Sequence, residues 1–462
     1  MVSPKVVVIG LDCAAPALVF DRYRAELPNL GRLIDSGCHG RLLSTNPPIT
    51  VPAWACMMSS QDPGQLGIYG FRNRKDHSYD GYGIASSKSI DRPLAWEILG
   101  AAGRTVTVLG VPPSFPPRPL NGAQVGCFLT PSTQGTYTHP PDLCEEIEKV
   151  APGYVVDVEG FRTDNKQELL GRIYDKTKKQ FAVARHLLTA RPTDFFMMVE
   201  MGTDRIHHSF WKFMDPAHRA HEPGNRYEHA IRDYYRYCDG QVGELLALLP
   251  GDTAVLVVSD HGAKKLDGGI CFNEWLIQKG YLTLQQYPDR PTPIGKAAID
   301  WSKTMAWGDG GYYGRLFMNV KGREPQGTIE PADYEKVRGR LIEAIEAIED
   351  HQGRRIGTKA YRPQDIYREV RGVAPDLMVY FGDLDWRSIG AVGGRSIHTF
   401  DNDTGPDDAN HDWEGIFIMS APGRTGAPRG RQDGLRIYDV GPTVLSLFGL
   451  APPPSMIGRS LV

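Results

Sequence analysis

The sequence predicts an α/β fold in which helices flank both faces of a central, mostly parallel β-sheet. Three apolar runs of β-forming residues, at 5–12, 195–201 and 254–258, end in or next to an acidic residue. Runs that are apolar on both faces are typical of strands buried in a parallel sheet. Segments with helical spacing separate these runs, and alternation of strands with helices favours a parallel arrangement.

The elements follow in a regular order through the first half of the chain. After the strand at 5–12, Leu30, Leu33 and Ile34 give residues 28–36 helical spacing, and Gly37 is a plausible stop. An apolar, helix-like segment follows Thr50. The remaining expected elements are a helix at 96–103, a strand at 104–110, a proline-rich loop at 112–119, an amphipathic helix at 166–190, a strand at 195–201, a helix at 227–249 and a strand at 254–258.

The pattern loosens after residue 264. Residues 265–372 mix aromatic and glycine-rich loops with one clear helix at 331–350, whose Pro331 suits a first helical turn. Strand character returns at 376–381 and 415–420, and residues 438–450 suggest a closing helix. We therefore expect a core formed by residues 1–264 and 373–462, interrupted by an inserted cap at 265–372.

The composition narrows the class of protein. The 462 residues carry a net charge of −3, with 41% hydrophobic and 23% charged residues, and lack the basic excess of a nucleic-acid binder. The first 20 residues fit neither a secretory signal nor a membrane span, so we expect a cytoplasmic protein. The seven scattered cysteines, without a Cys-x-x-Cys pair, favour reduced thiols. The sequence leaves open whether the protein forms a homo-oligomer.

Several strand ends carry residue types that bind metals. Asp260 and His261 follow the strand at 254–258, and a carboxylate beside an imidazole at such a strand end forms half of a metal site. Asp204 and His208 are four residues apart, so a helix would place both on one face and turn His207 away. The same residues could equally cap strand ends or satisfy core contacts. The full candidate set is Asp12, Asp204, His208, Asp260, His261 and His411.

Thr50 has a position suited to an anion. It lies between Pro48 and Pro52, directly before the apolar, helix-like segment. Proline near a helix start fixes the entry of the chain, and the free N–H groups and dipole of the helix start attract negative charge. A phosphoryl group would fit there.

Taken together, these residues resemble the alkaline phosphatase superfamily, specifically its type I phosphodiesterase/nucleotide pyrophosphatase branch. The ordered set is Asp12, Thr50 within Pro-Pro-Ile-Thr-Val-Pro-Ala-Trp, Asp204-x-x-x-His208, Asp260-His261-Gly262 and His411-x-x-x-Gly415. The match spans nearly the whole chain. Residues 301–304, 319–327 and 439–449 look like the predicted phosphohydrolase/phosphomutase group of that branch.

The resemblance implies an alkaline-phosphatase-like core with two divalent metal ions, most often zinc, with manganese as an alternative. One ion would be held by Asp12, Asp260 and His261 and would also contact Thr50. Its partner would be held by Asp204, His208 and His411. The implied reaction is in-line attack of metal-activated Thr50 on a small phosphate ester, giving a phospho-threonine intermediate that water then hydrolyses.

The sequence departs from the family near the expected substrate pocket. Leu66 stands where the family often has a histidine, and the asparagine that holds a phosphate oxygen has no unambiguous match. Candidate substrate contacts are Arg72, Asn73, Arg74 and Trp54, although the first three also fit a solvated charge cluster. Aromatic residues that could line a leaving-group pocket, or simply pack in the core, are Trp54, Tyr69, Phe71, Trp307, Tyr312 and Tyr313.

Other functions fit the sequence less well. The glycines of 308–314 miss the dinucleotide-loop spacing, and 401–405 lacks key positions of a calcium loop. A sulfatase would need a Cys/Ser-x-Pro-x-Arg nucleophile, which Cys13 does not provide. Phosphomonoesterase, phosphonate hydrolase and phosphomutase activity stay open as alternatives on the same metals. The complete ligand set and Thr50 disfavour a non-catalytic metal-binding scaffold.

Overall fold

A ten-stranded sheet forms the core of the protein, for which a computed structural model describes residues 4–462. Its strands are β1 (Val6–Leu11), β2 (Cys38–Leu43), β5 (Val106–Leu109), β6 (Gly122–Val125), β7 (Thr138–His139), β8 (Phe195–Glu200), β9 (Ala254–Val258), β21 (Glu414–Ser420), β22 (Gly430–Arg431) and β23 (Leu435–Arg436). Their order across the sheet is β22-β2-β21-β9-β1-β8-β5-β6-β7, and β23 also pairs with β2.

The centre of this sheet is parallel, as the sequence predicts. Strands β9, β1, β8, β5 and β6 all run in the same direction, whereas β21 and β7 are antiparallel to their neighbours. Val6 of β1 is paired with Phe195 on one side and with Ala254 on the other. Because the three strands start in register, their carboxyl ends meet at one edge of the sheet.

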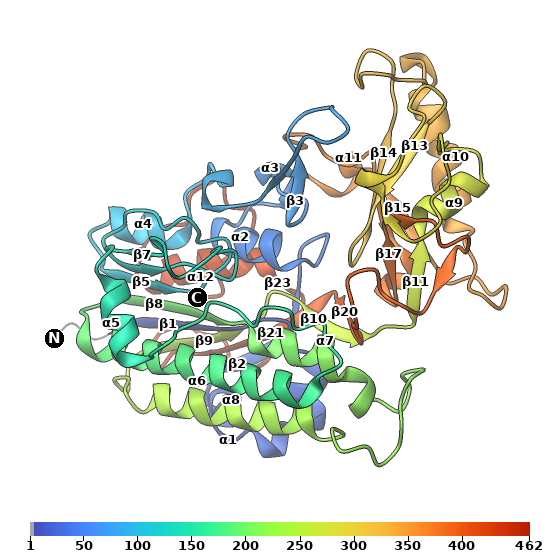
Figure 1. Ribbon diagram of the computed structural model, residues 1–462. Helices are drawn as coiled ribbons and strands as arrows, with labels where there is room; N and C mark the ends of the chain where they lie inside the picture. Colours follow the sequence, from blue (N-terminus) through green and yellow to red (C-terminus); the bar gives the residue numbers. More distant parts are fainter. Residues whose placement is uncertain (1–3) are drawn as a thin grey trace.

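Helices cover both faces of the sheet (Figure 1). The helices on one face are α1 (Pro28–Ser36), α5 (Leu143–Val150), α6 (Lys166–Ala190), α7 (Gly202–Met214) and α8 (Ala230–Leu246); those on the other are α2 (Thr50–Ser59), α4 (Ala95–Ala101) and α12 (Val440–Leu447). Successive side chains of a strand point to opposite faces. Accordingly, Val7 and Ile9 pack in one apolar cluster, and Val6 and Val8 pack in the other.

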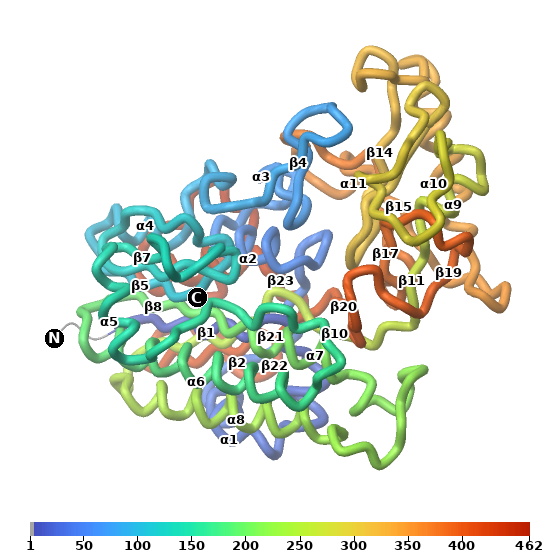
Figure 2. The backbone as a smooth tube through the Cα atoms, in the orientation of Figure 1, coloured from blue at the N-terminus to red at the C-terminus, as the bar shows by residue number. Residues whose placement is uncertain are grey.

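A second lobe is attached through a two-stranded ribbon. Strand β10 (Gly262–Lys265) pairs antiparallel with β20 (Ala409–Asp412), and both lie at the junction of the lobes (Figure 2). The lobe contains β11 (Gly268–Cys271), β13 (Ala306–Asp309), β14 (Gly314–Met318), β15 (Lys359–Tyr361), β16 (Leu377–Tyr380), β17 (Trp386–Ile389), β19 (His398–Thr399), α9 (Phe272–Gln278), α10 (Tyr334–Glu346) and α11 (Pro363–Ile366). It has an apolar core of its own.

The second lobe extends further along the chain than the predicted cap at 265–372. Strand β16 pairs with β14 and β15, and β17 pairs with β11. The strands at 377–380 and 386–389 therefore pair within the lobe and not with the core sheet, beyond the expected boundary at residue 372. The apolar run at 377–380 has the periodicity of any buried strand, and only its non-local pairing shows which sheet it joins.

The predicted local elements agree closely with the observed ones. The helices at 28–36 and 166–190 and the strand at 254–258 have the expected bounds. The helix expected at 227–249 is shorter, and the one expected at 331–350 begins with a single 3-10 turn before α10. Such differences are ordinary for helix ends, which fray and whose last turns are often irregular.

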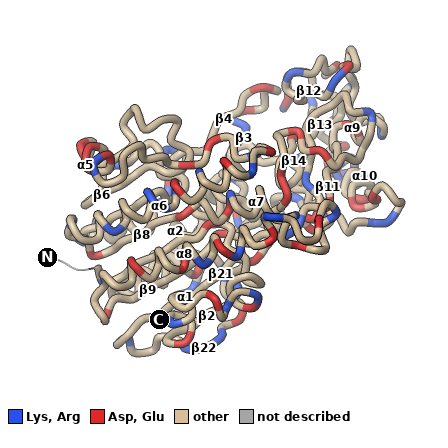
Figure 3. Tube along the Cα trace, turned by 60° about the horizontal axis from the view of Figure 1, so that its bottom comes forward, with Lys and Arg blue, Asp and Glu red and all other residues tan. Residues whose placement is uncertain are grey.

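The distribution of charge is mixed over the molecule. Basic and acidic residues alternate along the chain trace of both lobes (Figure 3). Among residues 4–462, no helix combines the length and the apolar character needed to cross a membrane. All seven cysteines are free thiols, and six of them are buried.

Candidate active site

The candidate ligands gather where three adjacent strands end. Asp12 directly follows β1, Asp260 lies two residues beyond β9, and α7 begins two residues after β8 with Asp204 in its first turn. Since β9, β1 and β8 are neighbours in the sheet, these carboxylates approach one another. Crevices at the carboxyl ends of parallel strands are the usual ligand sites of open α/β sheets.

One cluster surrounds the imidazole of His261. Its Nε2 lies 3.2 Å from Asp260 Oδ2, 3.8 Å from Asp12 Oδ1 and 3.2 Å from Thr50 Oγ1. Thr50 is the first residue of α2 and is buried. The structure thus brings the first predicted metal set together with the candidate nucleophile.

A second cluster adjoins the first. His208 Nε2 lies 3.1 Å from Asp204 Oδ1, and His411 Nε2 lies 3.8 Å from the same oxygen. The i, i+4 spacing on α7 places Asp204 and His208 on one face, as predicted. The rings of His261 and His411 stack with centroids 3.7 Å apart. One candidate ligand atom from each of Asp204, His261 and His411 lies within 4.8 Å of the other two, so His261 borders both clusters.

The side chains that face this centre fit divalent cations. Four of their buried atoms make no well-aligned hydrogen bond within the described residues, although His208 Nε2 and Asp204 Oδ1 lie 3.1 Å apart: Asp12 Oδ1, Asp204 Oδ1, His208 Nε2 and Asp260 Oδ2. A buried polar atom without a partner costs free energy. Carboxylate oxygens and imidazole nitrogens are the donors that zinc and similar ions accept, so bound cations would satisfy these atoms.

The electrostatics of the centre favour the same conclusion. Burial and the charge of Asp204 raise the pKa of Asp12 well above its usual value, and burial and Asp12 do the same for Asp260. Burial would also raise the pKa of Asp204, but His208 and Arg205 outweigh it and lower that pKa. Burial lowers the pKa of His261 to about 4, which keeps its imidazole neutral. Burial would also lower the pKa of His208, but Asp407 and Asp204 outweigh it and raise that pKa to about 9. Crowded carboxylates are stabilised by positive charge, which a protonated His208 or a bound cation supplies.

Hydrogen bonds to the far side of the ligands fix their orientation. Trp54 Nε1 donates to Asp12 Oδ2 at 2.7 Å, and the backbone N–H of Cys13 donates to Asp260 Oδ1 at 3.2 Å. His411 Nδ1 donates to the carbonyl oxygen of Pro48 at 2.7 Å. Such contacts determine which imidazole nitrogen keeps a free lone pair, here Nε2 of His411.

Asp407 is a supporting residue that the sequence reasoning missed. Its Oδ1 accepts a 2.7 Å hydrogen bond from His208 Nδ1, and its Oδ2 accepts from Arg162 Nε at 3.0 Å and from Arg387 Nη1 at 3.2 Å. The side chain is fully buried. The only local signal was its position four residues before His411, within a polar loop.

Replacing Asp407 with asparagine is expected to weaken metal binding about 10- to 100-fold, the usual cost of losing such a support. Asparagine keeps the shape but presents an uncharged amide to His208 and two arginines. Titration of the metal-depleted protein with zinc would measure the change. The control is Asp408→Asn, because the Asp408 carboxylate pairs with Lys212 at 3.4 Å. Equal zinc affinity of the Asp407→Asn variant and wild type would contradict this role.

A cavity of about 480 Å³ opens from the metal centre. Its polar lining includes Thr50, Arg72, Asp204, Arg205 and His411; its aromatic lining is Phe71, Phe128, Phe161, Tyr312 and Tyr313. Arg205 is bound to Asp204 and, at 2.7 Å, to Asp157. In the described part of the chain, the Arg72 guanidinium has no ion pair, and this residue is exposed.

Three of the four predicted substrate contacts do not line this cavity. Trp54 is fully buried and supports Asp12. The Asn73 side chain holds its own turn, accepting from Tyr69 N at 2.8 Å and donating to Gly70 O at 2.9 Å. Arg74 is buried 3.5 Å from Glu324 of the second lobe. These predictions are corrected, and Arg72 stays as the candidate.

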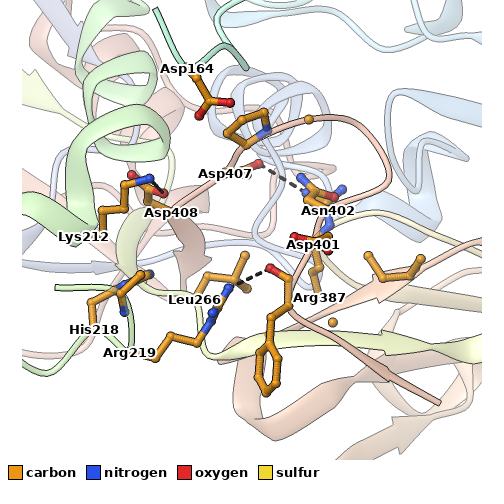
Figure 4. A pocket seen from close by; sticks show the side chains of 17 residues that line it. Asp164, Lys212, His218, Arg219, Leu266, Arg387, Asp401, Asn402, Asp407 and Asp408 are labelled. Atoms are coloured by element: carbon orange, nitrogen blue, oxygen red, sulfur yellow. Dashed lines mark hydrogen bonds and ion pairs between the residues drawn. The ribbon is translucent and has the colours of Figure 1, made fainter. Parts of the chain in front are cut away.

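A second, polar pocket of about 350 Å³ lies behind Asp407, and His218 is one of its walls (Figure 4). His218 is buried, and its Nδ1 accepts a 3.1 Å hydrogen bond from the backbone N–H of Ala220. Burial, together with the charges of Arg219 and Lys212, lowers the pKa of His218 to about 4. The folded protein therefore holds this side chain neutral.

Between pH 7 and pH 5 the buried His218 is expected to cost on the order of 2 kcal/mol of stability. Below about pH 6.5 the unfolded chain takes up a proton that folded His218 refuses until about pH 4. The contribution of His218 to the free energy of unfolding is therefore fully present above about pH 6.5 and is lost progressively as the pH falls from about 6.5 to about 4. Urea unfolding at several pH values should show a smaller loss for His218→Gln than for wild type. His229→Gln, at an exposed position, is the control and should keep the wild-type slope.

The fold and the site define a member of the alkaline phosphatase superfamily. The model of the family "Type I phosphodiesterase / nucleotide pyrophosphatase" matches residues 6–407, and the chain belongs to this family of phosphoric ester hydrolases. A comparison with curated protein sequences finds no match.

Solved structures share the fold over nearly their whole length. Human ectonucleotide pyrophosphatase/phosphodiesterase 5 is 14% identical, with a TM-score of 0.55, over 97% of this chain and 96% of that one. Phosphonoacetate hydrolase from Sinorhizobium meliloti, in complex with phosphonoacetate, is 17% identical, with a TM-score of 0.57, over 95% of this chain and 94% of that one. At these identities the likeness concerns the fold alone.

Proposed function

We propose that this protein is a two-metal phosphodiesterase that uses Thr50 as its nucleophile. The observation that carries the proposal is the convergence of buried, unpartnered ligand atoms next to the Thr50 hydroxyl. Asp12, Asp260 and His261 would hold one divalent ion, and Asp204, His208 and His411 the other. Zinc suits this mixed set of carboxylates and imidazoles, and manganese is the alternative.

Thr50 is placed to attack a phosphoryl group. Bound divalent ions would lower the pKa of the hydroxyl and neutralise charge on the reacting oxygens. As the first residue of α2, Thr50 lies where the opening backbone N–H groups lack partners within the helix and can donate to phosphoryl oxygens. In-line attack forms a bond from Thr50 Oγ1 to phosphorus and releases the alcohol. Water then hydrolyses the phospho-threonine.

The charges around the cavity favour a diester over a monoester. A monoester carries an additional negative charge, which calls for a free cation beside the metals. Arg205, the arginine next to Asp204, is already bound to two carboxylates. The cavity leaves room for a second organic group. The unpaired Arg72 is the observation that favours the alternative, a phosphonate hydrolase, phosphomonoesterase or phosphomutase.

The proposal can be tested with the metal-depleted protein, to which zinc and manganese are added in turn. The rate of hydrolysis is measured for bis-p-nitrophenyl phosphate, p-nitrophenyl phosphate and phosphonoacetate. We expect turnover of the diester to require added metal and to exceed that of the other two substrates. Faster cleavage of the monoester or phosphonate would favour the alternative. Turnover of the diester without metal would overturn the two-metal mechanism, and a metal-binding protein with no turnover would point to a scaffold.

A further inference from the structure

A larger cavity of about 630 Å³ continues from the active-site cavity. The two cavities share Arg72, Asp309, Gly310, Gly311, Arg387 and Thr404 in their linings. The second space, which we call the aromatic cavity, therefore adjoins the active-site cavity along these residues. Its size is in the range that encloses a small organic ligand.

Three aromatic rings form one wall of the aromatic cavity. Tyr79 and Trp301 stack with centroids 3.7 Å apart and planes 2° from parallel, and Trp307 meets Trp301 edge-on at 5.0 Å. The Tyr79 hydroxyl donates to Asn319 Oδ1 at 2.9 Å and accepts from Gln326 N at the same distance. Held in this way, the wall is rigid, and rigid aromatic surfaces bind apolar groups at a low entropic cost.

The opposite side of the cavity is also apolar. Pro291, Pro293, Ile294 and Ile299 line it, and Lys296 adds a single basic side chain. Three of the other charged residues, Arg72, Asp309 and Arg387, also line the active-site cavity. Asp309 pairs with Arg315, and Arg387 pairs with Asp407 at 3.2 Å. The fourth, Asp403, lies 4.0 Å from Arg387. Charge is thus concentrated near the metal centre, and hydrocarbon lines the interior beyond it.

Both lobes build this cavity. Tyr79 comes from the loop between β3 (Arg72–Arg74) and β4 (Tyr82–Ile84) of the core, which reaches towards the second lobe (Figure 1). Arg74 anchors that hairpin, with its guanidinium 3.5 Å from Glu324 and 5.2 Å from the centroid of the Trp307 ring. The cavity is therefore a feature of the interface between the lobes, fixed in place by a buried ion pair.

Two glycines form part of the border between the two cavities. Gly310 and Gly390 pack backbone against backbone, and a Cβ atom on Gly310 would come within 2.5 Å of the Gly390 nitrogen. Both glycines line the aromatic cavity, and Gly310 also lines the active-site cavity. Part of the border between the two spaces is therefore closely packed main chain, which requires glycine at these two positions.

We propose that the aromatic cavity binds an apolar organic group, aryl or alkyl, of a phosphodiester whose phosphoryl group lies at Thr50, with Arg72 at the junction. The proposal rests on the phosphodiesterase function proposed above and names its substrate class. A sugar or a second phosphate would need several polar partners, whereas the interior offers mainly aromatic and aliphatic surface. Burial of hydrocarbon there favours diesters with a large apolar group.

A series of p-nitrophenyl phosphodiesters tests the proposal with the metal-loaded protein. The second ester group is methyl, octyl, phenyl or 1-naphthyl, and release of p-nitrophenol gives kcat/KM. We expect wild type to prefer at least one large apolar group over methyl by about tenfold or more, about 1.4 kcal/mol. Whether the octyl diester or one of the two aryl diesters has the higher kcat/KM shows whether the cavity prefers an alkyl or an aryl group.

Two variants separate the cavity from the metal centre. Trp301→Ala removes part of the wall, and Gly295→Phe fills the space, since a Cβ on Gly295 would meet no atom within 4 Å. Both should abolish the preference for large groups and leave kcat/KM for the methyl diester within about twofold. Leu248→Ala, at an exposed apolar position of the core, is the control and should keep the wild-type preference.

Tryptophan fluorescence gives a second readout that needs no turnover. Octyl phosphate and 1-naphthyl phosphate, added to the metal-loaded protein, should change the emission saturably in wild type and not in Gly295→Phe. Hydrolysis of every diester at equal kcat/KM, without a fluorescence response, would overturn the cavity proposal and retain the phosphodiesterase function. A saturable response without hydrolysis of any diester would support the cavity and overturn the function.

Discussion

Thr50→Ala is expected to lower kcat/KM for a phosphodiester by about 1000-fold or more while both metal ions stay bound. The substitution removes the hydroxyl that lies 3.2 Å from His261 Nε2 at the start of α2. Alanine leaves the backbone N–H groups and the six Asp and His side chains of the candidate metal sites unchanged. Steady-state hydrolysis of bis-p-nitrophenyl phosphate, together with the metal content of the purified variant, would measure both parts of the prediction.

Thr50→Ser is the matched control for the nucleophile. Serine keeps a hydroxyl at the same position, so this variant should retain measurable hydrolysis and form a covalent phosphoryl adduct. Acid quenching during turnover, followed by mass spectrometry, should locate that adduct at position 50 in wild type and Thr50→Ser. If Thr50→Ala keeps more than a few per cent of wild-type activity with metals bound, Thr50 is not the nucleophile.

Asp12→Asn is expected to have opposite effects on the metal-free and the metal-loaded protein. Without cations, asparagine removes one of three crowded carboxylates, Asp12, Asp204 and Asp260. It thereby relieves the burial of charge and the repulsion, which together raise the pKa of Asp12 and Asp260. The metal-free variant should therefore be more stable than metal-free wild type by roughly 1 kcal/mol or more. The metal-loaded variant should be less stable, because a ligand has been lost and metal binding contributes less.

The same substitution should lower activity by about 100-fold or more, since one ion is lost or misplaced. Thermal unfolding with and without zinc, metal analysis and diester hydrolysis together test this prediction. Trp54→Phe makes a contrasting variant, because it removes the 2.7 Å hydrogen bond to Asp12 Oδ2 and part of a buried ring but no carboxylate. That change should destabilise the metal-free protein. If Asp12→Asn also lowered the stability of the metal-free protein, charge repulsion among the carboxylates would not dominate the stability of the candidate metal centre.

Much of the fold is encoded locally. The predicted bounds match the observed ones for the helices at 28–36 and 166–190 and for the strand at 254–258. They match because the spacing of apolar residues within a segment shows which of its faces is buried. The candidate metal ligands were also accessible to sequence reasoning. Asp12 and Asp260 follow parallel strands, whose carboxyl ends must meet at one edge, and the spacing of Asp204 and His208 is that of one helical face.

Contacts between distant residues decided the rest. The length of the second lobe depends on the pairing of β16 with β14, which periodicity does not specify. The roles of Trp54 and Asp407 depend on single hydrogen bonds to metal-ligand side chains far away in the chain. Sequence alone therefore named the residues that we propose carry the chemistry. The tertiary structure decided which residues support them and where a substrate can lie, because cavities and hydrogen-bond partners arise only when separate segments pack together.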